Sequence, residues 1–288
     1  MRNTLLVAAA FMAFSGSTAA SASSPIVLKL EQFRRSVAFR VEIGGKERLF
    51  QFDTGGGISF ISPEIAKELS CEKGAQVVGY RMTGDKLVAP RCDNVKLSIG
   101  RKQFTIALVG VAQLGELNAK GVTIDGMIAL DVFAGRTITL DFAGKRVIIE
   151  TPASASIRKA HGTELPMHMV REIGGYALAA HIDVPSKMGP LGFELDSGNG
   201  GTLLIAKPYA AAFGFDAAAP PREASLPIGG GIVAHGFVVP ADITLDGNLG
   251  MPFLKDYLVT LDLNRNGAWF ARNPVPPPPG MGEPPPQK

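Results

Sequence analysis

Two copies of an Asp-[Thr/Ser]-Gly motif are the residues of this 288-residue chain whose types and spacing indicate chemistry. Asp53-Thr54-Gly55 follows the apolar run 48–52, and Asp196-Ser197-Gly198 follows the run 191–195. Two carboxylates held about 3 Å apart cannot both ionise, so they share one proton. The ionised member takes a proton from water, and the protonated member polarises a carbonyl group. Such a pair predicts hydrolysis of a peptide bond with neither a metal ion nor a covalent nucleophile.

The segments before and after the two motifs match as well. In each half an alternating strand, a turn and a second strand deliver the Asp to a strand end. We expect these strands over residues 37–42 and 48–52 in the first half, and over 176–183 and 191–195 in the second. A Gly-rich turn and a short helix follow each motif. The first helix begins at Ser62-Pro63-Glu64, with Ser62 as N-cap, and the second covers residues 208–213.

A third block also occurs twice, as an apolar strand, an Asp-Gly turn, a short helical stretch and a closing strand. It covers residues 122–141 in the first half and 243–262 in the second. Its acids, Asp125 and Asp246 in the turns and Asp141 and Asp262 at the strand ends, are interpreted as structural, because turn Asp side chains bind nearby backbone. The first half carries about 22 more residues between the motif and this block, mostly within 71–99. The repetition predicts two β-rich lobes related by a pseudo-twofold axis.

The arrangement resembles the aspartic proteases, specifically exported bacterial proteins built from two fused retropepsin-like halves, over roughly residues 37–270. The resemblance implies an all-β, bilobal acid-protease fold, mainly β with short helices, whose two closed barrel-like lobes are related by a pseudo-twofold. It also implies one catalytic acid per lobe, a peptide or unfolded protein as substrate, and no cofactor. The catalytic acids are then Asp53 and Asp196, and the residues supporting their loops are Thr54, Gly55, Ser197 and Gly198.

The same resemblance implies a β-hairpin flap that closes over the cleft. In the first half the flap candidate is residues 77–88, with Met82, Thr83 and Gly84 near its tip. Tyr80 either covers the substrate or is a packing aromatic on the hairpin. In the second half the comparable place is residues 229–237, where Gly230 and Gly231 form either a mobile flap or a plain flexible loop.

Three positions depart from the family pattern. Gly56 and Asn199 stand where Ser, Thr or Ala is usual, and Ala129 stands where the block Asn248-Leu249-Gly250 keeps its glycine. These departures leave open a catalytically silent protein that binds an extended peptide in the same cleft. A third alternative is a generic β-sandwich or barrel in which both acid motifs are ordinary turns.

Composition and the N-terminus indicate the protein class and compartment. The 34 glycines and 21 prolines argue against a helix bundle, and a net charge of +3 is no nucleic-acid footprint. Residues 1–22 predict a signal peptide, with Arg2, the apolar run 5–14 and the cleavage site Ala20-Ser21-Ala22; the alternative is a buried N-terminal helix. The run is too short to span a membrane. We therefore expect export to the periplasm or outside the cell.

Cysteine and histidine positions bear on disulfides and metals. Cys71 and Cys92 form one disulfide in an oxidising compartment, or remain two separate buried thiols. The four histidines show no metal-ligand spacing, so no metal site is expected.

The expected organisation is one lobe over residues 23–155, a second over 156–272, and an extended, mobile Pro-rich tail over 273–288. A monomer suffices, because both acids are in one chain.

Overall fold

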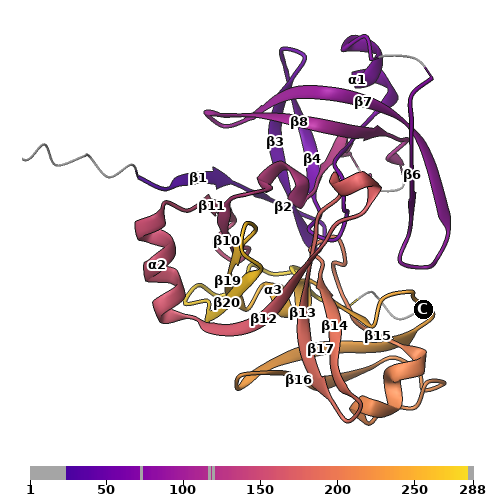
Figure 1. Ribbon diagram of the computed structural model, residues 1–288, viewed down its shortest axis with the longest axis vertical. Coiled ribbons are helices and arrows are strands. Elements are labelled where there is room, and N and C mark those ends of the chain that lie inside the picture. The colour runs from indigo at the N-terminus through magenta and orange to yellow at the C-terminus, as the bar shows by residue number, and fades with distance from the viewer. Residues whose placement is uncertain (1–23, 72–73, 116–117, 119–120, 285–288) are drawn as a thin grey trace, which may run out of the picture.

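The computed structural model describes residues 24–71, 74–115, 118 and 121–284, so the predicted signal peptide lies outside it. The chain folds into two lobes built from two large sheets, with short helices around and between them (Figure 1). The eight-stranded sheet has the order β2-β3-β4-β9-β5-β8-β7-β6. The twelve-stranded sheet has the order β1-β11-β10-β19-β20-β12-β13-β14-β18-β15-β17-β16. This is the bilobal, all-β acid-protease-like fold that the sequence predicts.

The first half contains strands β1 (Ile26–Lys29), β2 (Glu31–Phe33), β3 (Ser36–Ile43), β4 (Lys46–Phe52), β5 (Phe60–Ile61), β6 (Gln76–Tyr80), β7 (Lys86–Ile99), β8 (Lys102–Val111), β9 (Gly126–Ile128), β10 (Thr137–Asp141) and β11 (Arg146–Ile149). The second half contains β12 (Thr163–Val170), β13 (Ala179–Ser186), β14 (Gly189–Leu195), β15 (Leu203–Ala206), β16 (Arg222–Gly229), β17 (Ile232–Ala241), β18 (Gly247–Leu249), β19 (Tyr257–Asp262) and β20 (Gly267–Arg272). The helices are α1 (Pro63–Glu68), η2 (Leu130–Phe133), α2 (Pro152–His161), η3 (Ile173–Gly175), η4 (Lys207–Phe213) and α3 (Met251–Leu254).

Strand order shows the internal repeat directly. The run β2-β3-β4-β9-β5-β8-β7 of the first lobe has the same order as β12-β13-β14-β18-β15-β17-β16 of the second. Pairing directions agree too, since β4 and β14 run parallel to β9 and β18, and β5 and β15 run parallel to β8 and β17. The first lobe adds one strand, β6, at its edge. The extra length of the first half therefore builds the β6–β7 hairpin.

The repeated Asp-Gly turns have a packing reason. Gly126 pairs with Phe50, and Gly247 pairs with Phe193, three residues before each motif acid. A Cβ on either glycine would overlap the ring of its partner phenylalanine. The acid before each glycine, Asp125 or Asp246, helps to hold the paired strands. In the second lobe, Asp246 Oδ2 accepts the N–H of Gly192 of β14 at 2.9 Å. The structural interpretation of the turn acids agrees with these contacts.

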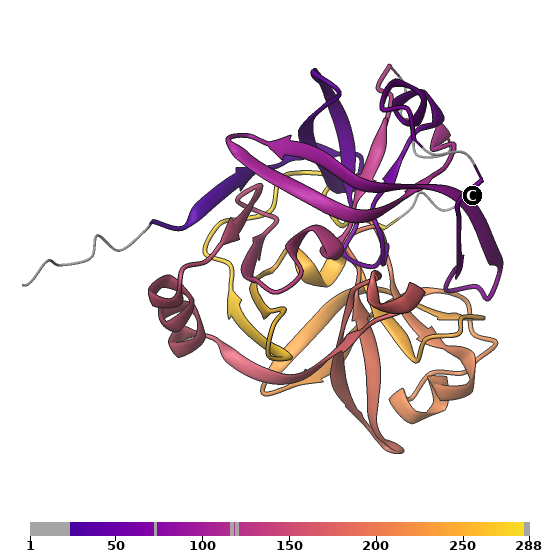
Figure 2. The same ribbon diagram turned by 45° about the horizontal axis from the view of Figure 1, so that its top comes forward.

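Six strands of the twelve-stranded sheet, β1-β11-β10-β19-β20-β12, come from both halves of the chain. At its centre β10 pairs with β19, and the buried hydroxyls of Thr139 and Thr260 hydrogen-bond at 2.9 Å. Helix α2 lies outside this sheet and leads into β12 (Figure 2). The expected boundary between residues 155 and 156 falls within α2. Within the described residues, no helix is long and apolar enough to cross a membrane.

Residues 279–282 of the Pro-rich tail pack against the rest of the chain, so the prediction of a mobile tail is wrong for them. Met281 is buried, the N–H of Gly282 donates to Arg35 O at 3.0 Å, and Gln32 Nε2 donates to Pro279 O at 2.7 Å. One apolar side chain anchors the segment, and Gly280 and Gly282 adopt the positive φ that the turn requires.

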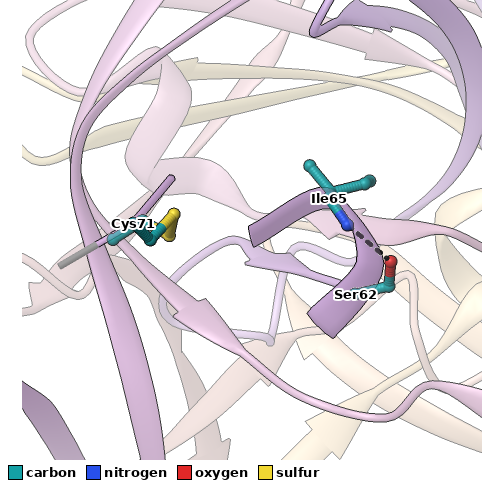
Figure 3. Close-up of a disulfide and its surroundings, with 4 residues drawn as sticks. Ser62, Ile65 and Cys71 are labelled. Carbon is teal, nitrogen blue, oxygen red and sulfur yellow. Dashed lines mark hydrogen bonds between the residues drawn. A yellow bond between two sulfur atoms is a disulfide. The ribbon is translucent and has the colours of Figure 1, made fainter. Parts of the chain in front are cut away.

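Cys71 and Cys92 form a disulfide, with their Cα atoms 5.2 Å apart. Cys71 follows α1, whose N-terminus is capped by Ser62 through a hydrogen bond from the N–H of Ile65 at 3.4 Å (Figure 3). Cys92 is buried on β7, opposite Val109 of β8. The disulfide therefore ties the segment leading to β6 onto the sheet, at the base of the β6–β7 hairpin.

Replacing both cysteines with alanine should lower the free energy of unfolding by about 3 kcal/mol, because the cross-linked loop gains entropy in the unfolded chain. The cross-link spans a sequence separation of 21 residues. Chemical denaturation with and without a reductant measures the effect. The wild-type chain should lose stability on reduction, whereas the double variant should not respond. A wild-type chain that is equally stable when reduced would contradict this prediction.

Candidate active site

The loops of the two motifs are held together by four reciprocal hydrogen bonds. Thr54 Oγ1 donates to Leu195 O at 2.6 Å and accepts the N–H of Ser197 at 2.9 Å. Ser197 Oγ donates to Phe52 O at 2.8 Å and accepts the N–H of Thr54 at 3.0 Å. Both side chains are fully buried. Each hydroxyl thus spans the pseudo-twofold axis and fixes the opposite loop.

This bracing brings the two carboxyl groups face to face. A Cβ added to Gly55 would lie 2.7 Å from Asp196 Cγ, and one added to Gly198 would lie 2.5 Å from Asp53 Cγ. The glycine of each motif therefore borders the acid of the other, and no larger residue fits at either position. Glycine is needed here for close approach.

The environments of the two acids differ. Asp196 accepts hydrogen bonds from the N–H of Gly198 (2.7 Å), the N–H of Asn199 (3.1 Å) and Asn248 Nδ2 (2.7 Å). Asp53 accepts the N–H of Gly55 at 3.0 Å. Burial and the neighbouring Asp196 raise the pKa of Asp53 well above its ordinary value, while the backbone donors lower it only in part. The two acids are thus unequal, because Asp196 accepts three hydrogen bonds and Asp53 accepts one.

The departures from the family pattern have local explanations. The Asn199 side chain donates to Asn248 Oδ1 at 2.8 Å and to Thr202 O at 3.0 Å, so it organises the second loop. A Cβ on Gly250 would overlap the carbonyl oxygens of Asn199 and Thr202, which is why the second lobe keeps its glycine. In the first lobe Ala129 is fully buried, and its N–H donates to Ser59 Oγ at 3.0 Å.

A cleft of about 610 Å³ lies over the two acids and is lined by both lobes. The β6–β7 hairpin forms one wall and reaches from the first lobe toward the second (Figure 1). Its turn, residues 81–85, includes Gly84 at φ +87°. Met82 O accepts the N–H of Thr244 at 2.7 Å, so the tip contacts the second lobe.

The structure places the first flap candidates at this cleft. Tyr80, Met82 and Thr83 line it. Tyr80 is 67% exposed, so it is not the packing aromatic of the alternative interpretation. The hairpin therefore presents an aromatic side chain to the cleft without burying it.

The second flap candidate is elsewhere. Gly230 lies at the β16–β17 turn, next to Thr163 and Leu165 of β12, and neither Gly230 nor Gly231 lines the cleft. The reason is topological. Because β16 and β17 correspond to β7 and β8, this turn corresponds to the β7–β8 turn, and the second lobe has no counterpart of β6. The plain-loop alternative therefore describes these glycines.

Two residues that the sequence reasoning missed complete the site. Glu194 precedes Asp196 by two residues on β14, so strand alternation places both on one face. Asn248 of β18 lies opposite Glu194 and donates from Nδ2 to Glu194 Oε2 at 3.1 Å as well as to Asp196. The available signal was a polar Asn at the place where the first repeat has Met127. In the described part of the chain, no group of three His, Cys, Asp or Glu side chains is placed to hold a metal ion.

Comparison with known proteins supports the fold alone, and the support comes from solved structures. No protein-family model matches the chain, and no curated protein matches it. Among solved structures, the crystal structure of basic 7S globulin from soybean is similar, with a TM-score of 0.55 and 12% sequence identity. The match covers 86% of this chain and 95% of the globulin. At this identity the similarity shows a shared bilobal architecture.

Proposed function

We propose that the protein is an aspartic-type endopeptidase that hydrolyses peptide bonds in a peptide or an unfolded protein. The observation that carries the proposal is the reciprocal bracing of the two motif loops by Thr54 and Ser197, because it sets Asp53 and Asp196 face to face beneath a cleft. A cleft of about 610 Å³ is the size of a site for several residues of an extended chain. The acid pair needs no cofactor for this reaction.

The mechanism follows from the asymmetry of the pair. Ionised Asp196 takes a proton from a water molecule, and the water oxygen attacks the scissile carbonyl carbon. Asp53 gives its proton to the carbonyl oxygen at the same time. The tetrahedral diol then collapses: Asp196 returns its proton to the leaving nitrogen, the C–N bond breaks, and Asp53 recovers a proton from a hydroxyl group. The raised pKa of Asp53 keeps its proton available above the usual range of a carboxyl.

The test is incubation of the purified chain with an unfolded protein over a range of pH, with and without a statine-type inhibitor. Cleavage that the inhibitor abolishes supports the proposal. Tight peptide binding without inhibitor-sensitive cleavage would instead favour the catalytically silent binding protein, which uses the same cleft.

Asn248→Leu should move the low-pH limb of kcat/KM to higher pH. The amide of Asn248 donates to Asp196 and so favours the singly ionised pair, which is the active form. Without this donor the pair takes up its second proton at a higher pH, and the pair titrates as one unit. Activity is present above the limb and is lost as pH falls through it.

The pH profile of kcat/KM on a peptide substrate measures this shift. Met127→Leu is the matched control, because Met127 occupies the corresponding position of the first lobe and donates no hydrogen bond. The low-pH limb of this control should stay in place. An unmoved limb in Asn248→Leu would refute the role given to the amide.

The proposed compartment is outside the cytoplasm. A disulfide and the absence, among the described residues, of a helix that could span a membrane are compatible with an exported protein. We propose that the enzyme acts as a monomer, since one chain supplies both acids.

A further inference from the structure

A third carboxyl group lies in the wall of the cleft, outside the catalytic pair. Glu194 is only 6% exposed, yet it lines the cleft beside Asp196. Its Oε2 accepts the amide of Asn248 at 3.1 Å. Its Oε1 accepts no hydrogen bond from the residues that the structure describes, so one oxygen of a buried acid is left for a ligand.

Protein groups do not neutralise this acid. Its nearest basic group is His181 Nε2, directly across from it on β13, at 3.8 Å from Oε1. Burial lowers the pKa of His181, so the imidazole tends to be neutral. Burial, Asp196 and Asp53 in turn raise the pKa of Glu194. A carboxyl in this setting gains most from a cation that arrives from outside.

The rest of the cleft has the same sign. Among the described residues that line it, the acids are Asp53, Asp85, Glu172, Glu194 and Asp196, and Arg81 at the hairpin turn is the one Arg or Lys side chain. A cleft lined mostly by acids, with low-dielectric walls, attracts positively charged substrate segments.

We infer that Glu194 is a specificity-determining residue that receives a basic side chain, Lys or Arg, of a residue flanking the scissile bond. This inference rests on the proposed function. Residues two apart on one face of a strand lie about 7 Å apart, so Glu194 is one side chain away from the reacting centre. A lysine next to the cleaved bond spans that distance, and its ammonium supplies the hydrogen-bond donor that Oε1 lacks. The corresponding first-lobe residue, Gln51, carries no charge, so the preference belongs to the Asp196 side of the cleft.

The test compares peptides that carry lysine, or its uncharged analogue norleucine, at either residue flanking the cleaved bond. The wild-type chain should favour lysine at one of these positions by at least about tenfold in kcat/KM, as one charged hydrogen bond provides. Glu194→Gln should bring the ratio close to one. Glu164→Gln, an exposed acid on β12, is the matched control and should keep the wild-type ratio.

Dissociation constants of the same peptides for the Asp53→Asn chain separate this inference from the proposed function. If the wild-type chain cleaves no peptide, the proposed function fails. The role of Glu194 is then still decided by comparing the dissociation constants of the lysine and norleucine peptides. A wild-type ratio near one, or a full ratio retained by Glu194→Gln, overturns the inference. Should Glu194→Gln fail to fold in thermal unfolding, the wild-type ratio alone decides.

Discussion

Asp53→Asn and Asp196→Asn should each lower kcat/KM for peptide cleavage by at least about 10³-fold, because each removes one partner of the proton transfer. Asn at position 196 cannot take a proton from water. Asn at position 53 has no acidic proton to transfer to the carbonyl oxygen. Asparagine keeps the size of aspartate and still accepts the N–H of Gly55 or Gly198, so both variants should fold.

Thermal unfolding of the same preparations checks the fold. Neutralising Asp53 also removes a buried carboxyl whose raised pKa disfavours its charged form, so this variant should be no less stable than the wild type at neutral pH. Asp93→Asn is a control, since Asp93 is an exposed acid that pairs with Arg91 on β7 and is not among the residues that line the cleft. Undiminished cleavage by either catalytic-pair variant would refute the proposed function.

The sequence was sufficient to predict the parts of the fold that occur twice. Both acid motifs, the strands before them and the Asp-Gly blocks each gave two independent signals, and the two lobes repeat one strand order. Local rules also placed α1, because a Ser-Pro-Glu start carries its own cap.

Features present once were harder to predict. The Gly-rich turn at 229–231 has the composition of a mobile flap, but composition does not reveal which hairpin of a repeat it belongs to. The tail has no apolar periodicity, and a single buried Met281 was enough to pack it. Glu194 and Asn248 are adjacent only because β14 and β18 pair in parallel, a long-range contact that spacing along the chain does not show.

Thr54→Val should lower the free energy of unfolding by about 2–6 kcal/mol, since it strands two buried backbone groups at a cost of about 1–3 kcal/mol each. Valine matches threonine in shape but neither donates to Leu195 O nor accepts the N–H of Ser197. The backbone amide of residue 54 still reaches Ser197 Oγ, so half of the bracing remains.

Activity should fall together with stability in this variant, because the loops that hold Asp53 and Asp196 lose their fixed spacing and positioning errors of about 1 Å cost roughly 10²-fold in rate. Denaturant unfolding and kcat/KM on the same peptide measure both effects. Thr105→Val on the exposed face of β8 is the matched control: the same change there should leave stability within about 0.5 kcal/mol of the wild type. If Thr54→Val lost stability but kept full activity, the bracing would hold the lobes together without positioning the acids.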